Sequence, residues 1–388
     1  MGLFDAFKKK RTAAKEPVQT QKAASASKST AAQTASPENR LRTTLPKDFA
    51  DTVGAGDVAA IKAVFDRCRI DATSGYAKET ALAFAGMPEE AVRWLVAQGA
   101  DINAKDLYGN TPLHKEAACW QGNTELLVQL GADIEAKNND GNTPLHRAAC
   151  KGVAQTVERL LALGADPLAR NNEERTPLEQ SLRECRNADI VNVAAVADLL
   201  VEAGDGTAPA AKRSVESIGK SFEFYRDSFN KDSLEETDAA LSHLYELFGV
   251  APAARRRIHD GVSPIAVDAE TWQKQHAELW DYLVPAKGHA ATAQGEAIRI
   301  TGKVAYEVLD NGGINWDADF NKMLCALARF FRSGNPLSET EADEADALVD
   351  ALEDGFGEKE PDRLSELAVR WVLANPDPMP LGKQAYRR

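Results

Sequence analysis

Hydrophobic positions between residues 46 and 206 follow a helical period that glycines interrupt. One stretch has a stripe of small apolar residues, then a glycine, then a second apolar stripe, at Leu145, Ala148, Ala149, Gly152, Val157, Leu160 and Leu161. Apolar residues three and four apart lie on one face of an α-helix, and a glycine commonly ends a helix. The pattern therefore predicts pairs of short helices, each of which buries one face.

Two motifs repeat through this region with the same step. Thr-Pro-Leu-His at 111–114 recurs at 143–146, and as Thr-Pro-Leu-Glu at 176–179. Gly-Ala-Asp begins at Gly99, Gly131 and Gly164, so both motifs advance by 32 and then by 33 residues. A threonine followed by a proline suits the start of a helix, because threonine caps free N–H groups and proline lacks one.

These motifs resemble the ankyrin repeat family, whose unit is a β-turn and two antiparallel helices with the signature T-P-L-H-x-A. The resemblance implies about five stacked units over 46–206, the first of them a capping unit at 46–75. It also implies that His114 and His146 are structural, and that the turns and first helices form a concave row suited to protein binding.

The pattern after a linker at 207–212 is helical. We expect helices near 214–230, 233–248, 268–284, 290–310, 316–332, 338–353 and 361–374. Alternation typical of strands is missing there, and residues 213–388 resemble no family with an assigned activity. We therefore predict an all-α protein with a basic disordered tail at 1–45, an ankyrin-repeat solenoid at 46–206 and a separate α-helical domain at 213–388.

The charge is distributed unevenly along the chain. The 388 residues carry a net charge of −13, but residues 1–47 hold ten basic and three acidic residues. The remainder holds 36 basic and 56 acidic residues, a balance of −20. An acidic body repels phosphate backbones, which argues against nucleic-acid binding and favours a basic protein partner.

The composition also bears on location. No stretch has the roughly 18 uninterrupted apolar residues of a membrane-spanning helix. Residues 1–11 could form a short helix with Leu3, Phe4 and Phe7 beside lysines, which suits peripheral membrane contact. A frayed soluble terminus is the favoured interpretation, because so short a helix is marginal in water. The five cysteines form no C-x-x-C pair, which predicts reduced thiols in a cytoplasmic protein without a metal or cofactor.

Candidate partner-binding residues occupy the expected turn tips and first helices. Tyrosine, tryptophan and arginine are the side chains that most often carry binding energy at interfaces. The set is Lys105, Asp106, Leu107, Tyr108, Lys115, Trp120, Asn139, Asp140, Arg147, Lys151, Asn172 and Glu173.

A second candidate site lies in the C-terminal half. The set is His289, Glu296, Arg299, Asn315, Trp316 and Asp317. Glu296 and Arg299 are three residues apart and share one helix face. The loops before and after that helix are about 30 Å apart if the helix is unbroken, so one compact active site is not expected. A structural ion pair is the favoured interpretation of Glu296 and Arg299.

These features predict a non-enzymatic protein–protein interaction module whose ankyrin stack binds a partner through its concave face. Two alternatives remain open. The acidic body could neutralise a basic protein, as an immunity- or inhibitor-type protein does. The C-terminal helical domain could instead be an enzyme of unknown class that the repeats target to its substrate.

Overall fold

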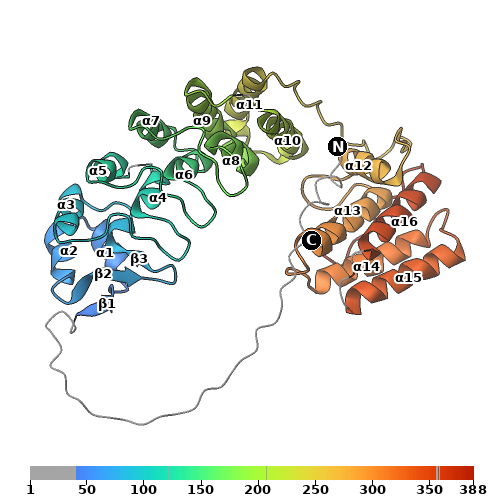
Figure 1. Cartoon of the computed structure of the whole chain (residues 1–388). Coiled ribbons are helices and arrows are strands. Elements are labelled where there is room, and N and C mark those ends of the chain that lie inside the picture. Colours follow the sequence, from blue (N-terminus) through green and yellow to red (C-terminus); the bar gives the residue numbers. More distant parts are fainter. Residues whose placement is uncertain (1–40, 121, 207, 355–356, 358) are drawn as a thin grey trace, which may run out of the picture. The chain divides into compact units, whose positions relative to one another are not determined.

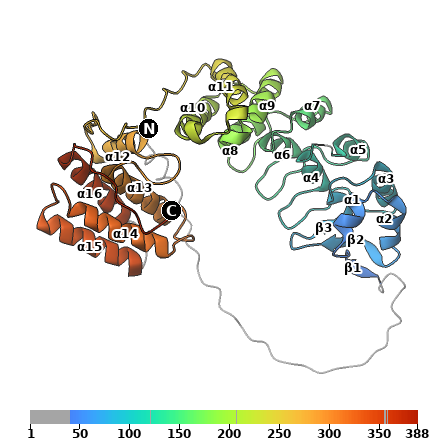
Figure 2. The same ribbon diagram turned by 180° about the vertical axis from the view of Figure 1, so that it is seen from behind.

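The computed structural model of the chain describes residues 41–120, 122–206, 208–354, 357 and 359–388. The described chain is mostly helical and divides into two compact units (Figures 1 and 2). One unit holds the described residues up to Phe222 together with Phe229–Ala253, and the other holds Glu223–Ser228 and Ala254–Arg388. Within the described residues, no helix is long and apolar enough to cross a membrane.

The first unit begins with a small sheet that the sequence analysis did not predict. Strands β1 (Arg42–Thr44), β2 (Cys68–Ser74) and β3 (Glu79–Thr80) pair in that order, β1 parallel and β3 antiparallel to β2. The prediction of an all-α protein was therefore wrong for this capping region. The strand β2 forms because Cys68 and Ala72 are buried while Arg69 and Asp71 point to solvent.

The last residues of the range predicted as a disordered tail, 1–45, are part of the folded unit. Residues 42–44 pair with β2, and Leu45 is buried in the core of the first unit. These contacts order the chain from Arg42 onward. The rest of the predicted tail up to residue 40, including residues 1–11, lies outside the described residues.

Short helices are arranged in pairs, and the first pair lies between β1 and β2 along the chain. They are α1 (Phe49–Gly54) and α2 (Val58–Val64), the 3-10 helix Ala81–Ala83 and α3 (Glu89–Ala97), α4 (Pro112–Ala117) and α5 (Thr124–Gln129), α6 (Pro144–Cys150) and α7 (Ala154–Ala162), and α8 (Pro177–Glu184) and α9 (Ile190–Glu202). Figure 1 shows α4, α6 and α8 in one row and α5, α7 and α9 in a second row, with long turns extending from the first row. From α4 onward, each first helix packs on the next first helix and each second helix on the next second helix, as in a solenoid.

The two motif histidines connect neighbouring repeats. His114 Nδ1 accepts from the backbone N–H of Thr111 at 3.2 Å, and His114 Nε2 donates to the Asn142 carbonyl of the next repeat at 2.9 Å. His146 binds Thr143 N–H and the Arg175 carbonyl in the same way. Burial lowers the pKa of His114 to about 4, so this ring is neutral at physiological pH. This geometry matches the structural role that the resemblance implies.

Helices α10 (Pro209–Tyr225) and α11 (Leu234–Phe248) continue the core of the repeats. Val215 and Phe222 of α10 and Leu244 of α11 belong to the same hydrophobic cluster as Val196 and Leu200 of α9. The division between the two compact units therefore differs from the predicted linker at 207–212. The apolar faces of α10 and α11 cover the apolar end of the stack, which the sequence pattern does not indicate.

The second unit packs around one central helix. It consists of α12 (Trp272–Leu283), α13 (Ala293–Ala305) with the π-helical turn Tyr306–Asp310, α14 (Ala318–Phe331), α15 (Glu339–Asp354) and α16 (Glu360–Ala374). Helix α13 contacts α12, α14 and α16, and its residues Ile298, Ile300 and Val304 are buried in the core. The helices lie within a few residues of the predicted ranges, because caps and apolar periodicity are local signals.

Candidate functional site

The first half of the C-terminal candidate set forms one buried cluster. Glu296, in the first turn of α13, is completely buried and Arg299 is 1% exposed. Arg299 Nη2 and Nε bind the two carboxylate oxygens of Glu296 at 2.6 and 2.9 Å. His289 Nδ1 lies 2.9 Å from Glu296 Oε1, and the backbone N–H of Ala290 donates to Oε2 at 2.9 Å. The structure thus brings these three predicted residues together around one carboxylate.

Tyr386 completes this cluster and was missed by the sequence analysis. Its hydroxyl donates to Glu296 Oε1 at 2.7 Å, and its side chain is buried. The two residues are 90 positions apart, so no local pattern could connect them. Burial opposes ionisation of Glu296, but the Arg299 guanidinium and the hydrogen bonds outweigh it and hold the pKa of this carboxyl at about 2. Burial and the neighbouring Glu296 charge raise the pKa of Tyr386, so its hydroxyl remains a donor.

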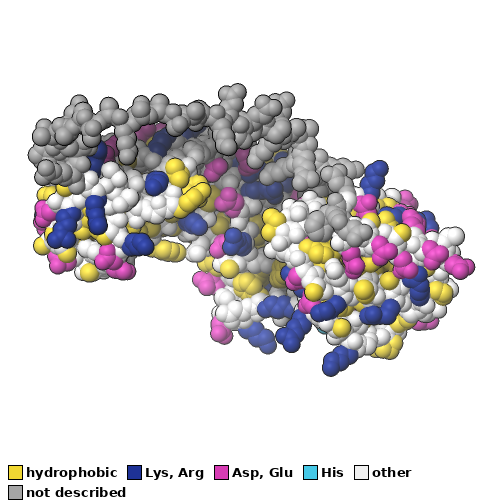
Figure 3. Space-filling model, turned by 90° about the horizontal axis from the view of Figure 1, so that it is seen from below, with side chains coloured by type: hydrophobic (Ala, Val, Ile, Leu, Met, Phe, Trp, Pro, Cys, Tyr) yellow, Lys and Arg dark blue, Asp and Glu magenta, His cyan; other side chains and the backbone are white. Residues whose placement is uncertain are grey.

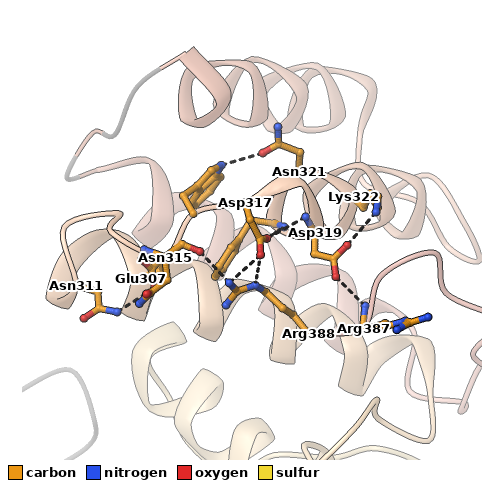
Figure 4. Close-up of polar contacts among 11 residues, drawn as sticks. Glu307, Asn311, Asn315, Asp317, Asp319, Asn321, Lys322, Arg387 and Arg388 are labelled. Atoms are coloured by element: carbon orange, nitrogen blue, oxygen red, sulfur yellow. Dashed lines mark hydrogen bonds and ion pairs between the residues drawn. The ribbon is translucent and has the colours of Figure 1, made fainter.

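The other half of the set forms a second cluster after α13 (Figure 4). Asp317 caps α14 and binds the Arg388 guanidinium, with Nη2 at 2.8 Å and Nε at 3.0 Å from Oδ2. Arg388 Nη2 also donates to the Asn315 carbonyl at 2.9 Å. The Trp316 ring stacks on Phe320 at a centroid distance of 4.8 Å.

A buried carboxylate binds the loop between α13 and α14 that carries this second cluster. The buried carboxylate of Glu307 accepts from the Asn315 backbone N–H at 2.6 Å and from the Asn311 amide at 3.1 Å. Glu307 was also missed, although its spacing of four and eight residues from two asparagines is a usable signal. The six predicted residues therefore form two separately bonded clusters. Within the described chain, no group of histidine, cysteine and acidic residues could hold a metal ion.

The predicted partner-binding turns of the first unit are hydrogen-bonded to one another. The Lys105 ammonium donates to the Lys137 carbonyl at 2.8 Å, 32 residues further on. The Asn139 amide donates to the Leu107 carbonyl, and the Asn172 amide donates to the Asn139 carbonyl, both at 2.9 Å. Lys105, Asn139 and Asn172 therefore fasten each turn to the next.

Asp106 and Lys115 have a structural role as well. Asp106 is buried, and its Oδ1 accepts from the backbone N–H groups of Tyr108 and Asn110 at 2.8 Å each. The Lys115 ammonium lies 3.1 Å from Asp106 Oδ2 and also binds Glu79. Burial opposes ionisation of Asp106, but the bonds from Asn110 and Lys115 outweigh it and lower the pKa of this carboxyl. Asp106 therefore cannot contact a partner directly, because its burial leaves it inside the turn.

Two protein-family models match the first compact unit. The family model for three copies of ankyrin repeats matches residues 115–201, and the model for many copies matches residues 80–127. Residues 80–201 are ankyrin repeats. The C-terminal half matches no family model, and no curated protein matches the chain.

The ankyrin repeats leave a smaller set of the predicted residues available at the surface. Leu107 and Tyr108 are 54% and 53% exposed at the tip before α4, and Trp120 is 63% exposed just after α4. Arg147 lies half-buried on α6, and its Nε is buried without a hydrogen-bond partner among the described residues. The other exposed members are Lys105, Asn139, Asp140, Lys151, Asn172 and Glu173. Of these, Lys105, Asn139 and Asn172 already bond neighbouring turns.

Proposed function

We propose that this chain is a non-enzymatic recognition protein whose ankyrin stack binds a protein partner through its turns and first helices. Ankyrin repeats indicate a protein–protein interaction module. The observation that carries the finer proposal is the exposed pair Leu107 and Tyr108 on a turn that is hydrogen-bonded to its neighbour, together with the exposed Trp120 just after α4. A rigid surface loses little conformational freedom on binding, and exposed aromatic side chains gain the most from being covered.

The finer architecture belongs to the same proposal. We propose about five repeat units, extended by α10 and α11, and an independent helical domain over 254–388. A separate hydrophobic cluster around α13 supports that domain, since a domain needs a core of its own. We further propose that the protein acts in the cytoplasm, which the unpaired cysteines support, and that it needs no cofactor.

An affinity purification with the tagged full chain tests the partner surface. The triple variant Tyr108→Ala, Trp120→Ala and Arg147→Ala should lose the partners that the wild-type chain recovers. Tyr306→Ala is the matched control, because Tyr306 is 57% exposed on the other compact unit. Circular dichroism of each variant confirms that the helices are retained. Equal recovery of partners by the triple variant and the wild-type chain would overturn the proposed surface.

A second candidate function is neutralisation of a basic protein. The balance of −20 over residues 48–388 supports it, since opposite net charges accelerate association. On the face drawn in Figure 3, however, acidic and basic side chains of the second unit are interspersed, so the charge is not gathered into one patch there. The test is the salt dependence of the partner's affinity: a steep loss between 50 and roughly 200 mM salt supports this role, and no change contradicts it.

A catalytic role for the C-terminal unit is the remaining alternative. Glu296 is its strongest acid–base candidate from the sequence, but that carboxylate is completely buried and already accepts five hydrogen bonds. A general base needs a free lone pair within reach of a substrate. The geometry therefore favours a structural role for Glu296.

A further inference from the structure

Arg299 has a hydrogen-bonding nitrogen that no described residue uses. Its Nε and Nη2 bind Glu296, whereas the buried Nη1 has no acceptor within the described part of the chain. The whole side chain is 1% exposed. A buried donor on a charged group without an acceptor is unfavourable, and most such groups in folded proteins have a partner. The acceptor of this nitrogen, whether a water molecule or a ligand oxygen, therefore lies outside the described chain.

A cavity of about 150 Å³ adjoins this arginine. Arg299 and Lys303 of α13 line one side of it, Lys287 and Gly288 belong to the loop before α13, and Trp280 of α12 forms an aromatic wall. Phe224 and Tyr225, from the segment Glu223–Ser228 of the same compact unit, complete the aromatic side.

The arrangement of α12 against α13 depends on a glycine. A Cβ atom at Gly302 would lie 2.3 Å from Trp280 Cζ3, which is closer than carbon atoms can approach. Only glycine at this position allows the indole to lie against α13. The cavity wall is therefore determined by the packing of the helices, and it exists without a ligand.

The charges at the cavity are predominantly positive. Lys303 and Lys287 form no salt bridge with any described residue, and the carboxylate of Glu296 is already occupied by Arg299, His289 and Tyr386. Burial, followed by the Arg299 charge, lowers the pKa of Lys303. This is the expected response of an ammonium group that lacks an anionic partner. The protein has a net charge of −13, so a cationic cavity departs from its overall balance.

We propose that this cavity binds the phosphate group of a small phosphomonoester, with the apolar part of the ligand against Trp280. A phosphate offers three acceptor oxygens, which matches the three donor groups on Arg299, Lys303 and Lys287, whereas a carboxylate offers two. The cavity is smaller than the roughly 300 Å³ at which sites for drug-sized ligands begin, so it suits the anionic end of a ligand and a small substituent. The proposal does not depend on the ankyrin surface.

Calorimetric titration of the full chain tests the proposal with three probes: inorganic phosphate, phenyl phosphate and benzoate. We expect saturable binding of both phosphates, tighter for phenyl phosphate, and at least tenfold weaker binding of benzoate than of phenyl phosphate. Failure of the wild-type chain to bind either phosphate overturns the proposal. Benzoate binding as tight as phenyl phosphate overturns the choice of phosphate.

Two variants locate the binding in the cavity. Lys303→Gln should weaken phenyl phosphate binding at least tenfold, and Lys287→Gln, in an exposed position that tolerates substitution, should weaken it at least threefold. Lys322→Gln is the control, because this exposed lysine of α14 pairs with Asp319 and does not line the cavity. Undiminished affinity in both cavity variants, or equal losses in the control, would refute this location.

Discussion

Replacement of Glu296 by glutamine tests the buried cluster of the C-terminal unit. The side chain accepts hydrogen bonds from His289, Ala290, Arg299 and Tyr386. An amide of the same shape has one acceptor oxygen, so the substitution Glu296→Gln leaves donors facing an NH2 group. It also removes the negative charge that balances Arg299, which is 1% exposed.

The size of the effect follows from the burial of the pair. Removal of one partner from a buried ion pair leaves an uncompensated charge and commonly lowers the free energy of unfolding by about 3–5 kcal/mol. The pKa of Glu296 gives a consistent figure, since the difference between the usual value of 4.5 and about 2 corresponds to about 3 kcal/mol. We therefore expect Glu296→Gln to lower the free energy of unfolding of this unit by about 3 kcal/mol at neutral pH.

The pH dependence has a defined sign. Because the folded pKa of Glu296 lies below 4.5, its contribution to stability is present above that pH and is lost as the pH falls toward about 2. The difference in unfolding free energy between the wild-type chain and Glu296→Gln should therefore shrink over this interval. Above pH 5 it should stay constant.

Urea unfolding followed by tryptophan fluorescence measures this difference, because four of the six tryptophans, Trp272, Trp280, Trp316 and Trp371, lie in the C-terminal unit. Glu344→Gln is the matched control: Glu344 pairs with Arg363 at the surface, so its loss should be below about 1 kcal/mol. The reasoning is refuted if the Glu296→Gln chain unfolds within 1 kcal/mol of the wild-type chain at pH 7, or if the two substitutions have equal effects.

Two further predictions concern packing and capping. Gly302→Ala should lower the unfolding free energy of the C-terminal unit by about 1–3 kcal/mol, because the added Cβ displaces Trp280. Gly382→Ala is the control in the same urea experiment and should change this free energy little, because a Cβ at Gly382 would meet nothing within 4 Å. Thr143→Ala should destabilise the repeats by about 1–2 kcal/mol, because the buried Thr143 hydroxyl caps α6 and lies 2.9 Å from His146 Nδ1. Unfolding followed by circular dichroism measures that loss, and an unchanged midpoint would contradict the assigned cap.

Helix starts in the repeats could be predicted from the sequence, whereas strand β2 and the fold of the turn at Asp106 could not. The capping threonines are encoded within a few residues, and the structure contains them at the starts of α6 and α8. Strand β2 was missed because its parallel partner β1 lies 26 residues away, with Arg42 opposite Cys68. Asp106 looked like an exposed tip residue, yet the turn folds back so that its carboxylate caps two N–H groups.

The candidate sites show the same limit. The sequence places Glu296 and Arg299 on one helix face, and they do form an ion pair. It could not indicate that Tyr386 donates to this pair or that Arg388 binds Asp317, because those partners are 90 and 71 residues away. The sequence also could not indicate which side chains of a turn are exposed. Tyr108 and Asp106 are two residues apart, yet Tyr108 is exposed and Asp106 is buried.

Local chemistry along the chain was thus sufficient to establish the ankyrin repeats and most helix positions. A threonine before a proline and apolar residues three and four apart act within one repeat, and the step of 32 or 33 residues shows that the unit recurs. The tertiary structure alone decided that α10 and α11 extend the stack, which carboxylates are neutralised, and that Arg299, Lys303 and Trp280 line one cavity. These features depend on contacts between segments that are far apart in sequence. Such contacts form because the whole core must pack closely, and no short stretch of sequence encodes that packing.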